Sequence, residues 1–182
     1  MPHILKTILI TCLLTLPLAG CGNAGEKEQS ATPATAANGI MTGQRAPDFT
    51  LKDLNGKTFT LAELRDKKPV LLIFWATWCP ACRQAMPYFA ALHAQYAPRG
   101  LEIISINIAS NDPLPRVQSF QEITKLPYRI LYDEKTDVSR LYAVFGIPTT
   151  MLIDRDGIIQ YRGNALPVDI NQILDKLLAS GS

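Results

Sequence analysis

Two long apolar segments with a helical pattern between them dominate the chain after residue 43. Val70 to Ala76 is an unbroken apolar run, and Leu101 to Ile108 is the next segment with the character of a buried strand. Such runs are typical of strands that are covered on both faces of a sheet. Pro80 to about Ala97 has the period of a helix and stops at Pro98-Arg99-Gly100. A strand, a helix and a strand in this order predict a right-handed crossover with parallel strands.

Shorter segments extend this pattern in both directions. Asn55-Gly56 is a hairpin turn signal between the first two expected strands, and Asp154 to Gly157 is the turn of a late antiparallel hairpin. The other expected elements are strands at 46–51, 58–60, 129–132, 149–153 and 158–161, and helices at 116–124, 136–145 and 169–178. The sequence therefore predicts an α/β fold with a central mixed β-sheet, helices on both faces and an extra N-terminal β-hairpin.

The first 20 residues have the pattern of an export signal. Lys6 and the free amino terminus precede an apolar core, Thr7 to Leu18, which is shorter than the roughly 20 residues needed to span a bilayer. Leu18-Ala19-Gly20-Cys21 resembles the lipobox of bacterial lipoproteins. The resemblance implies cleavage before Cys21 and acylation of its sulfur and new amino group. The alternative is an ordinary signal peptide with an incidental cysteine.

The segment 21–42 separates this signal from the domain. After Cys21 it is small, polar and alanine-rich, without a sustained apolar period, so we expect a flexible tether. Residues 43–182 then form one domain that is long enough to bury a core. The formal net charge of the whole chain is +2 and no basic stripe occurs, which argues against a nucleic-acid partner. Membrane attachment would depend on several acyl chains at the anchor.

The export signal reduces four cysteines to two free thiols. Cys12 lies in the segment that would be removed, and Cys21 would carry lipid, which leaves Cys79 and Cys82. Exported proteins normally use paired cysteines as structural disulfides. A bridge across three positions closes a very small loop and constrains the unfolded chain little. A structural disulfide is therefore a weak explanation for this pair.

Metal and haem sites fit the two cysteines poorly. A structural zinc site needs four ligands, and the mature chain adds only His93, about 16 Å beyond Cys82 along the same expected helix. Haem attachment needs a histidine directly after the second cysteine, where Arg83 stands. The same separation argues against a Cys/His hydrolase. We expect no metal and no bound cofactor, and we expect His93 to be a surface or partly buried residue.

A redox-active pair fits the position of the two cysteines. Pro80 is favoured in the first turn of a helix, which places Cys79 at the helix N-terminus. There the free N–H groups and the helix dipole favour a thiolate, so the pKa of Cys79 should lie below the ordinary value of about 8.5. Cys82 lies one turn further in. We expect an exposed Cys79 to attack a partner's disulfide and a sheltered Cys82 to displace that partner.

Several motifs resemble the thioredoxin superfamily, and within it the membrane-tethered, extracytoplasmic proteins of the TlpA/ResA type. Phe74 to Cys82 (FWATWCPAC) resembles the active-site signature of that family. Gly146 to Thr150 (GIPTT) resembles its cis-proline loop, and Leu152-Ile153-Asp154 resembles the strand that follows. Ala46 to Phe49 resembles the opening of these domains. The resemblance covers about residues 43–180 and implies a thioredoxin-like fold.

The resemblance implies a role for each matching residue. Cys79 corresponds to the nucleophile and Cys82 to the resolving thiol. Pro148 corresponds to the cis-proline that faces the disulfide, and its alternative is a plain proline at the start of a strand. Trp78 would cover the site and contact partners. Ile147 precedes the proline as in reductive thioredoxins, which favours the reducing direction.

The chain departs from the family at the buried acid that assists the resolving thiol. The two positions at which relatives carry that acid are Ile73 and Ala85 here, so no carboxylate in the sequence is assigned to Cys82. This departure puts a role in cytochrome c maturation in doubt. Arg83 either helps to lower the pKa of the nucleophile or is a solvated surface charge. Peroxiredoxins and copper-carrying relatives have cysteine patterns that this chain lacks.

The functional prediction is a lipid-anchored, extracytoplasmic thiol–disulfide oxidoreductase that reduces protein disulfides. We expect a monomer that receives electrons from a thiol relay in the membrane. A disulfide oxidant or isomerase of the same fold is one alternative, and the reduction potential distinguishes it. A docking module without turnover is another, and an assay for the reduction of insulin disulfides distinguishes it.

Overall fold

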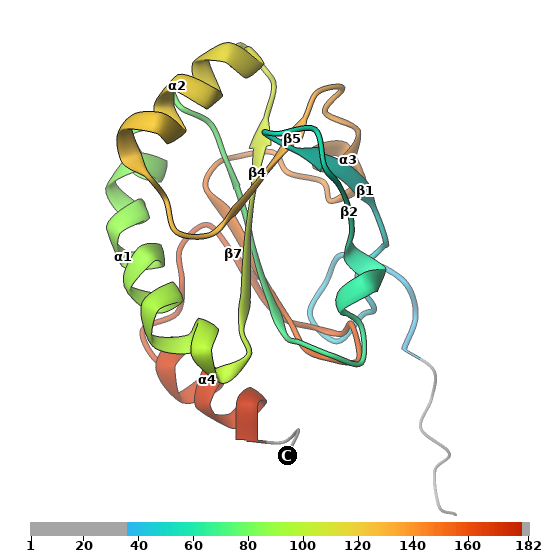
Figure 1. The fold of residues 1–182 in the computed structure, drawn as a ribbon. Helices are drawn as coiled ribbons and strands as arrows, with labels where there is room; N and C mark the ends of the chain where they lie inside the picture. The colour runs from blue at the N-terminus through green and yellow to red at the C-terminus, as the bar shows by residue number, and fades with distance from the viewer. Residues whose placement is uncertain (1–35, 180–182) are drawn as a thin grey trace, which may run out of the picture. The chain divides into compact units, whose positions relative to one another are not determined.

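A seven-stranded mixed sheet forms the centre of the computed structural model, which describes residues 36–179 (Figure 1). The strands are β1 (Thr50–Asp53), β2 (Thr58–Thr60), β3 (Val70–Trp75), β4 (Glu102–Ile108), β5 (Arg129–Asp133), β6 (Thr149–Ile153) and β7 (Ile159–Gly163). The helices are α1 (Pro80–Tyr96), α2 (Leu114–Thr124), α3 (Asp137–Leu141) and α4 (Ile170–Ala179), with 3-10 turns η1 (Leu61–Leu64) and η2 (Ala97–Arg99). The order across the sheet is β2-β1-β5-β4-β3-β6-β7.

The pairing of the strands confirms the predicted crossover and both hairpins. β3 and β4 are parallel and are joined by α1, while β1 pairs antiparallel with β2, and β6 with β7. β6 also runs antiparallel to β3, with Phe74 opposite Thr149. The end of β3 and the start of β6 therefore lie at the same edge of the sheet. This register places the segment after Trp75 beside the segment before Thr149.

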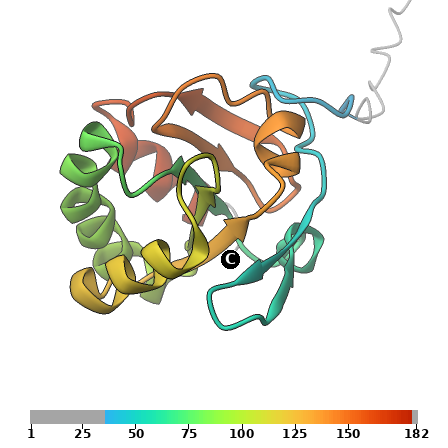
Figure 2. The same ribbon diagram turned by 90° about the horizontal axis from the view of Figure 1, so that it is seen from above.

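Side chains alternate between the two faces of the sheet, and each face is covered. On β3, Leu71 and Ile73 belong to the core under α1 and α4, while Leu72 and Phe74 belong to the core that includes Tyr142. Figures 1 and 2 show α1, α2 and α4 on one side of the sheet and α3 on the other. Full burial of each such side chain contributes roughly 1.5–3 kcal/mol. The prediction of helices on both faces is confirmed.

Some element boundaries differ from the prediction. The segment expected as a strand at 46–51 enters the sheet only at Thr50, because the Ala46 N–H bonds Gly157 and the Phe49 carbonyl accepts from Leu61. The helix expected at 116–124 begins at Leu114, since a first turn tolerates proline. The helix expected at 136–145 ends at Leu141, and Ala143 has a left-handed φ of 45°.

The packed part of the chain begins before the expected boundary at residue 43. The Gly39 N–H donates to the Arg45 carbonyl at 2.9 Å, and the Gly43 N–H donates to Ile159 at 2.8 Å. Ile40 packs against the core. The last residues of the expected tether therefore belong to the fold. The expected signal peptide and Cys21 lie outside the described residues. Within residues 36–179, no helix has the length and apolar character needed to cross a membrane.

Candidate active site

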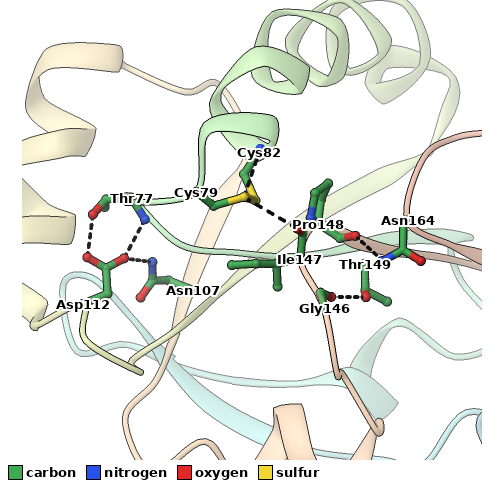
Figure 3. Close-up of a disulfide and its surroundings, with 10 residues drawn as sticks. All are labelled: Thr77, Cys79, Cys82, Asn107, Asp112, Gly146, Ile147, Pro148, Thr149 and Asn164. Carbon is green, nitrogen blue, oxygen red and sulfur yellow. Dashed lines mark hydrogen bonds between the residues drawn. A yellow bond between two sulfur atoms is a disulfide. The ribbon is translucent and has the colours of Figure 1, made fainter.

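Cys79 and Cys82 form a disulfide at the N-terminus of α1 (Figure 3). Cys79 is the N-cap residue, with an extended backbone, and Pro80 occupies the first turn as predicted. The Cys82 N–H donates to Cys79 Sγ at 3.1 Å. Helix N-termini leave N–H groups without intrahelical partners, and here one of them meets the sulfur. This geometry favours negative charge on Cys79 after reduction.

The expected difference in exposure between the two cysteines is absent in the disulfide form. Cys79 is 4% exposed and Cys82 is 2% exposed. Both belong to an apolar cluster with Trp75 and Met86, against which Ile147 packs. The expectation of an exposed Cys79 is therefore wrong for this state, because the loop that ends at Ile147 lies against the sulfur.

The segment before β6 reaches the disulfide from the strand next to β3, because β6 pairs with β3. The Ile147–Pro148 peptide bond is cis, and the Ile147 carbonyl oxygen lies 3.7 Å from Cys79 Sγ (Figure 3). Asn164 Nδ2 donates to the Pro148 carbonyl at 3.1 Å, and Thr149 Oγ1 donates to the Gly146 carbonyl at 2.6 Å. Side-chain hydrogen bonds thus hold this loop on both sides of the proline.

Exposed aromatic side chains flank the motif residues. Trp78 is 45% exposed, and its Nε1 donates to the Ser110 carbonyl at 2.9 Å. Phe145, two residues before Ile147, is 97% exposed. Sequence reasoning missed Phe145, although its place beside the Gly146-Ile147-Pro148 motif was a signal. Trp75 is buried against Phe120, with ring centroids 5.4 Å apart, and belongs to the core.

A buried carboxylate on the far side of the active-site loop was also missed. Asp112 is fully buried, and its carboxylate accepts hydrogen bonds from the Thr77 N–H at 2.6 Å, the Thr77 hydroxyl at 2.5 Å and Asn107 Nδ2 at 2.7 Å. Figure 3 shows this group on the opposite side of Thr77 from the disulfide. Asp112 lies between the expected strand at 101–108 and the expected helix at 116–124, and no motif marked it.

Apolar and hydroxyl side chains surround the inner cysteine. A cavity of about 10 Å³ is lined by Ile73, Cys82, Ser105 and Tyr128, together with other residues of the core. Burial raises the pKa of the Tyr128 hydroxyl, so this group stays protonated at neutral pH. Ala85 is partly buried in the neighbouring core cluster. No carboxylate lines this cavity among the described residues.

Two other candidates from the sequence lie on α1, beyond Cys82. The His93 ring is partly buried, 6.2 Å from the ring of Tyr128, and Arg83 is exposed on α1. Between residues 36 and 179, no group of three or more His, Cys, Asp or Glu side chains is placed to hold a metal ion.

Known proteins resemble this chain over most of its length. The AhpC/TSA family matches residues 42–162. A thiol-disulfide oxidoreductase ResA of Geobacillus thermodenitrificans is 34% identical over 174 residues, which cover 94% of this chain and 96% of that protein. The thioredoxin-like protein YneN of Bacillus subtilis is 39% identical over 140 residues, which cover 75% of this chain and 81% of that protein.

The solved structures extend this similarity to three dimensions. A thiol:disulfide interchange protein of the thioredoxin family from Chlorobium tepidum superimposes with a TM-score of 0.63 at 27% identity. The match covers 78% of this chain and 99% of that one.

Proposed function

Because the chain belongs to the AhpC/TSA family of thioredoxin-like proteins and is a thiol–disulfide oxidoreductase, we propose that it reduces protein disulfides outside the cytoplasm. The observation that carries this proposal is the Cys79–Cys82 disulfide at a helix N-terminus, facing the Ile147 carbonyl at 3.7 Å. On one side of this disulfide the helix N-terminus stabilises a thiolate, and on the other side lies the backbone carbonyl of Ile147.

The reaction proceeds by two exchanges of thiolate and disulfide. Cys79 thiolate attacks one sulfur of the substrate disulfide, a bond forms between the two sulfurs, and the other substrate sulfur leaves as a thiolate that takes a proton from solvent. Cys82, after losing its proton, attacks Cys79 Sγ and releases the second substrate sulfur, which is protonated in turn. The protein ends as the disulfide, and the substrate has gained two electrons and two protons.

The reduced protein has to be regenerated by a dithiol. We propose that a thiol relay in the membrane donates these two electrons and becomes a disulfide itself. The residue before the proline supports the reducing direction, since Ile147 resembles the corresponding residue of reductive thioredoxins. An oxidant or isomerase of the same fold would exchange disulfides through the same two sulfurs in the opposite direction.

The substrate would contact exposed aromatic side chains of the two motif segments. Trp78 precedes Cys79 and Phe145 lies two residues before Ile147, and both offer apolar surface because they are more than two-fifths exposed. Ile147 and Pro148 would contact the substrate through the backbone, and Pro80 keeps Cys79 at the start of the helix. Aromatic side chains bind partners with little loss of conformational freedom. We infer that an extended segment around the substrate cysteine occupies this position.

The location of the protein is part of the proposal and depends on Cys21. Lipid at this residue would hold a monomeric domain at a bacterial membrane, on the periplasmic or outer side. Expression of the full chain in a bacterial host that is supplied with an alkyne-labelled fatty acid tests the lipid attachment directly. Label on the wild-type chain and its absence from a Cys21→Ser chain are expected. Equal labelling of both chains, or of neither, would contradict the lipid anchor.

The activity is tested by the reduction of insulin disulfides with a dithiol as the recycling reductant. The mature wild-type chain should accelerate precipitation of the insulin B chain, and Cys79→Ser should abolish the acceleration. Cys21→Ser serves as the matched control, because it removes a cysteine outside the redox pair. If wild type and Cys79→Ser were equally inactive, a docking module would replace the enzyme in this account.

A further inference from the structure

Asp112 is a buried carboxylate that the exchange mechanism described above does not use. It has no exposed surface, and its three donors, two from Thr77 and one from Asn107, are all uncharged. None of the ion pairs between described residues includes it. A buried charge without a cation is unfavourable, and only hydrogen bonds compensate for its lost hydration here.

The partner Asn107 also bears an unfavourable arrangement. It is fully buried, and while its Nδ2 donates to Asp112, its Oδ1 meets no donor among the residues that the structure describes. Leaving a buried acceptor unpaired costs roughly 1–3 kcal/mol in mutational studies. Buried polar atoms without a hydrogen-bond partner are expected mainly at functional sites, where function offsets the loss of stability.

The hydrogen bonds of Asp112 hold the loop that leads into the nucleophile. Thr77 lies two residues before Cys79, and the Cys79 N–H turns back to the Ala76 carbonyl at 3.2 Å. The next residue, Trp78, is attached to the same 109–113 loop through Ser110. The segment between β3 and α1 is therefore fixed by one loop at two successive residues. A shift of Thr77 would be transmitted directly to the sulfur.

We propose that Asp112 is a positioning residue for Cys79, and that its buried negative charge makes the Cys79–Cys82 pair a stronger reductant. The position follows from the two bonds to Thr77. The effect of the charge follows from its distance to the sulfur. Thr77 lies two residues before Cys79, and two residues of chain span at most about 7 Å, so the carboxylate lies on the order of 10 Å from Cys79 Sγ.

The sign of the charge effect is set by electrostatics. A negative charge disfavours a second one nearby, so Asp112 opposes the Cys79 thiolate, whereas the helix N-terminus favours it. The reduced form is thereby less stabilised, and a less stabilised reduced form gives electrons away more readily. Burial raises the pKa of the Tyr132 phenol, with smaller contributions from the charges of Glu134 and Asp112.

The test is the redox equilibrium of the mature chain against a dithiol buffer, for wild type and Asp112→Asn at one pH. Asparagine keeps the shape and removes the charge. A unit charge at roughly 10 Å and an effective dielectric constant of about 20 changes the equilibrium constant by roughly tenfold. We expect Asp112→Asn to shift the equilibrium toward the reduced form by about tenfold, which corresponds to about 30 mV.

Asp133 provides a matched control for loss of a buried carboxylate. It is 1% exposed and likewise accepts three donors, the Val138 N–H at 3.2 Å, the Ser139 N–H at 2.7 Å and the Ser139 hydroxyl at 2.5 Å. Those bonds hold the start of α3 instead of the active-site loop. Asp133→Asn should destabilise the fold as Asp112→Asn does, yet shift the redox equilibrium by less than about twofold.

Thr77 provides a second test, independent of how well Asp112→Asn folds. Thr77→Val keeps the shape and the N–H bond but removes the hydroxyl bond to Asp112, and it should lower kcat/KM for insulin reduction by about tenfold. Thr77→Ser retains the hydroxyl and should recover most of this loss. Equal kcat/KM for the valine and serine variants would contradict the positioning role.

Two redox results would overturn the charge effect. One is an Asp112→Asn equilibrium equal to that of wild type, and the other is an equal shift in Asp133→Asn, which would indicate general loosening of the fold. The inference rests on thiol–disulfide exchange by Cys79 and is separate from the proposed direction. A strongly oxidising wild-type protein would contradict the reductase proposal, while a shift specific to Asp112 would still support the inference.

Discussion

Cys79 Sγ lies 3.7 Å from the carbonyl oxygen of Ile147, although 68 positions separate the two residues in the chain. The contact follows from the pairing of β3 with β6, which places Phe74 opposite Thr149. Cys79 lies a few residues after Phe74, where the loop from β3 enters α1. Ile147 lies a few residues before Thr149, in the loop that leads into β6. The site is thus a product of the sheet register as much as of the cysteine motif.

Replacement of the inner cysteine should trap the reaction halfway. Cys82→Ser retains the nucleophile Cys79 but removes the sulfur that releases the partner, so a mixed disulfide with insulin should accumulate. Non-reducing electrophoresis and mass spectrometry would detect the mixed disulfide, and a reductant should cleave it. The Cys79→Ser variant is the control. Accumulation in Cys79→Ser in place of Cys82→Ser would mean that the roles of the two sulfurs are reversed.

Trp78 should matter more to the substrate than to the fold. Trp78→Phe loses the hydrogen bond to Ser110, which at a half-exposed position should lower the free energy of unfolding by about 0.5 kcal/mol. Trp78→Ala should in addition raise KM for insulin several-fold, with kcat changed less. Tyr88, which is 47% exposed on α1, is the matched aromatic. An equal rise of KM in Tyr88→Ala would remove the special role of Trp78.

Trp75 should tolerate phenylalanine unusually well for a buried tryptophan. Its Nε1 is buried without a partner among the described residues, so Trp75→Phe removes an unfavourable N–H while it creates a small cavity. The two effects oppose each other, and we expect a net change within about 1 kcal/mol, against about 3–5 kcal/mol for Trp75→Ala. Urea unfolding measures both. A loss above about 3 kcal/mol in Trp75→Phe would show that the N–H is satisfied in solution.

Local sequence signals predicted the parts of the site that depend on neighbouring residues. Pro80 marks the start of α1 because proline fits a first helical turn, and the run from Val70 has the composition of a strand buried on both faces. The end of α3 was predicted too late. The left-handed conformation of Ala143 has no residue signature, since alanine is a good helix former.

Contacts between distant segments could not be predicted in the same way. Thr77 and Asp112 are 35 positions apart, and they meet because β3 and β4 are parallel and end at the same edge of the sheet. A carboxylate in a loop is most often solvated, so its residue type carried no information about burial. The burial of Cys79 has the same origin, since it depends on the approach of Ile147 from β6.

The stability of the fold should decline at alkaline pH. Burial, with a further contribution from the Asp48 charge, raises the pKa of the Tyr142 hydroxyl, which donates a hydrogen bond to the Pro47 carbonyl. The unfolded chain ionises this group near about pH 10 and the folded protein at higher pH, so its contribution is complete below about pH 10 and is lost as pH rises further.

Tyr142→Phe isolates this effect in urea unfolding from about pH 7 to about pH 11. The variant should lose about 1 kcal/mol near neutral pH, from the missing hydrogen bond, and should show a shallower alkaline decline than wild type. The decline should not vanish, because burial raises the pKa of Tyr128 as well. An identical slope in wild type and variant would exclude Tyr142 as its source.

The reduction potential of the Cys79–Cys82 pair tests the proposed reductase most directly. The mature chain would be equilibrated with dithiol buffers of known potential, and the fraction of disulfide would be measured by alkylation and mass spectrometry. We predict a value near about −270 mV, where thioredoxin lies, as a reductase supplied by a membrane relay requires. A value near about −120 mV, typical of a strong disulfide donor, would contradict the reducing direction and make the protein an oxidant.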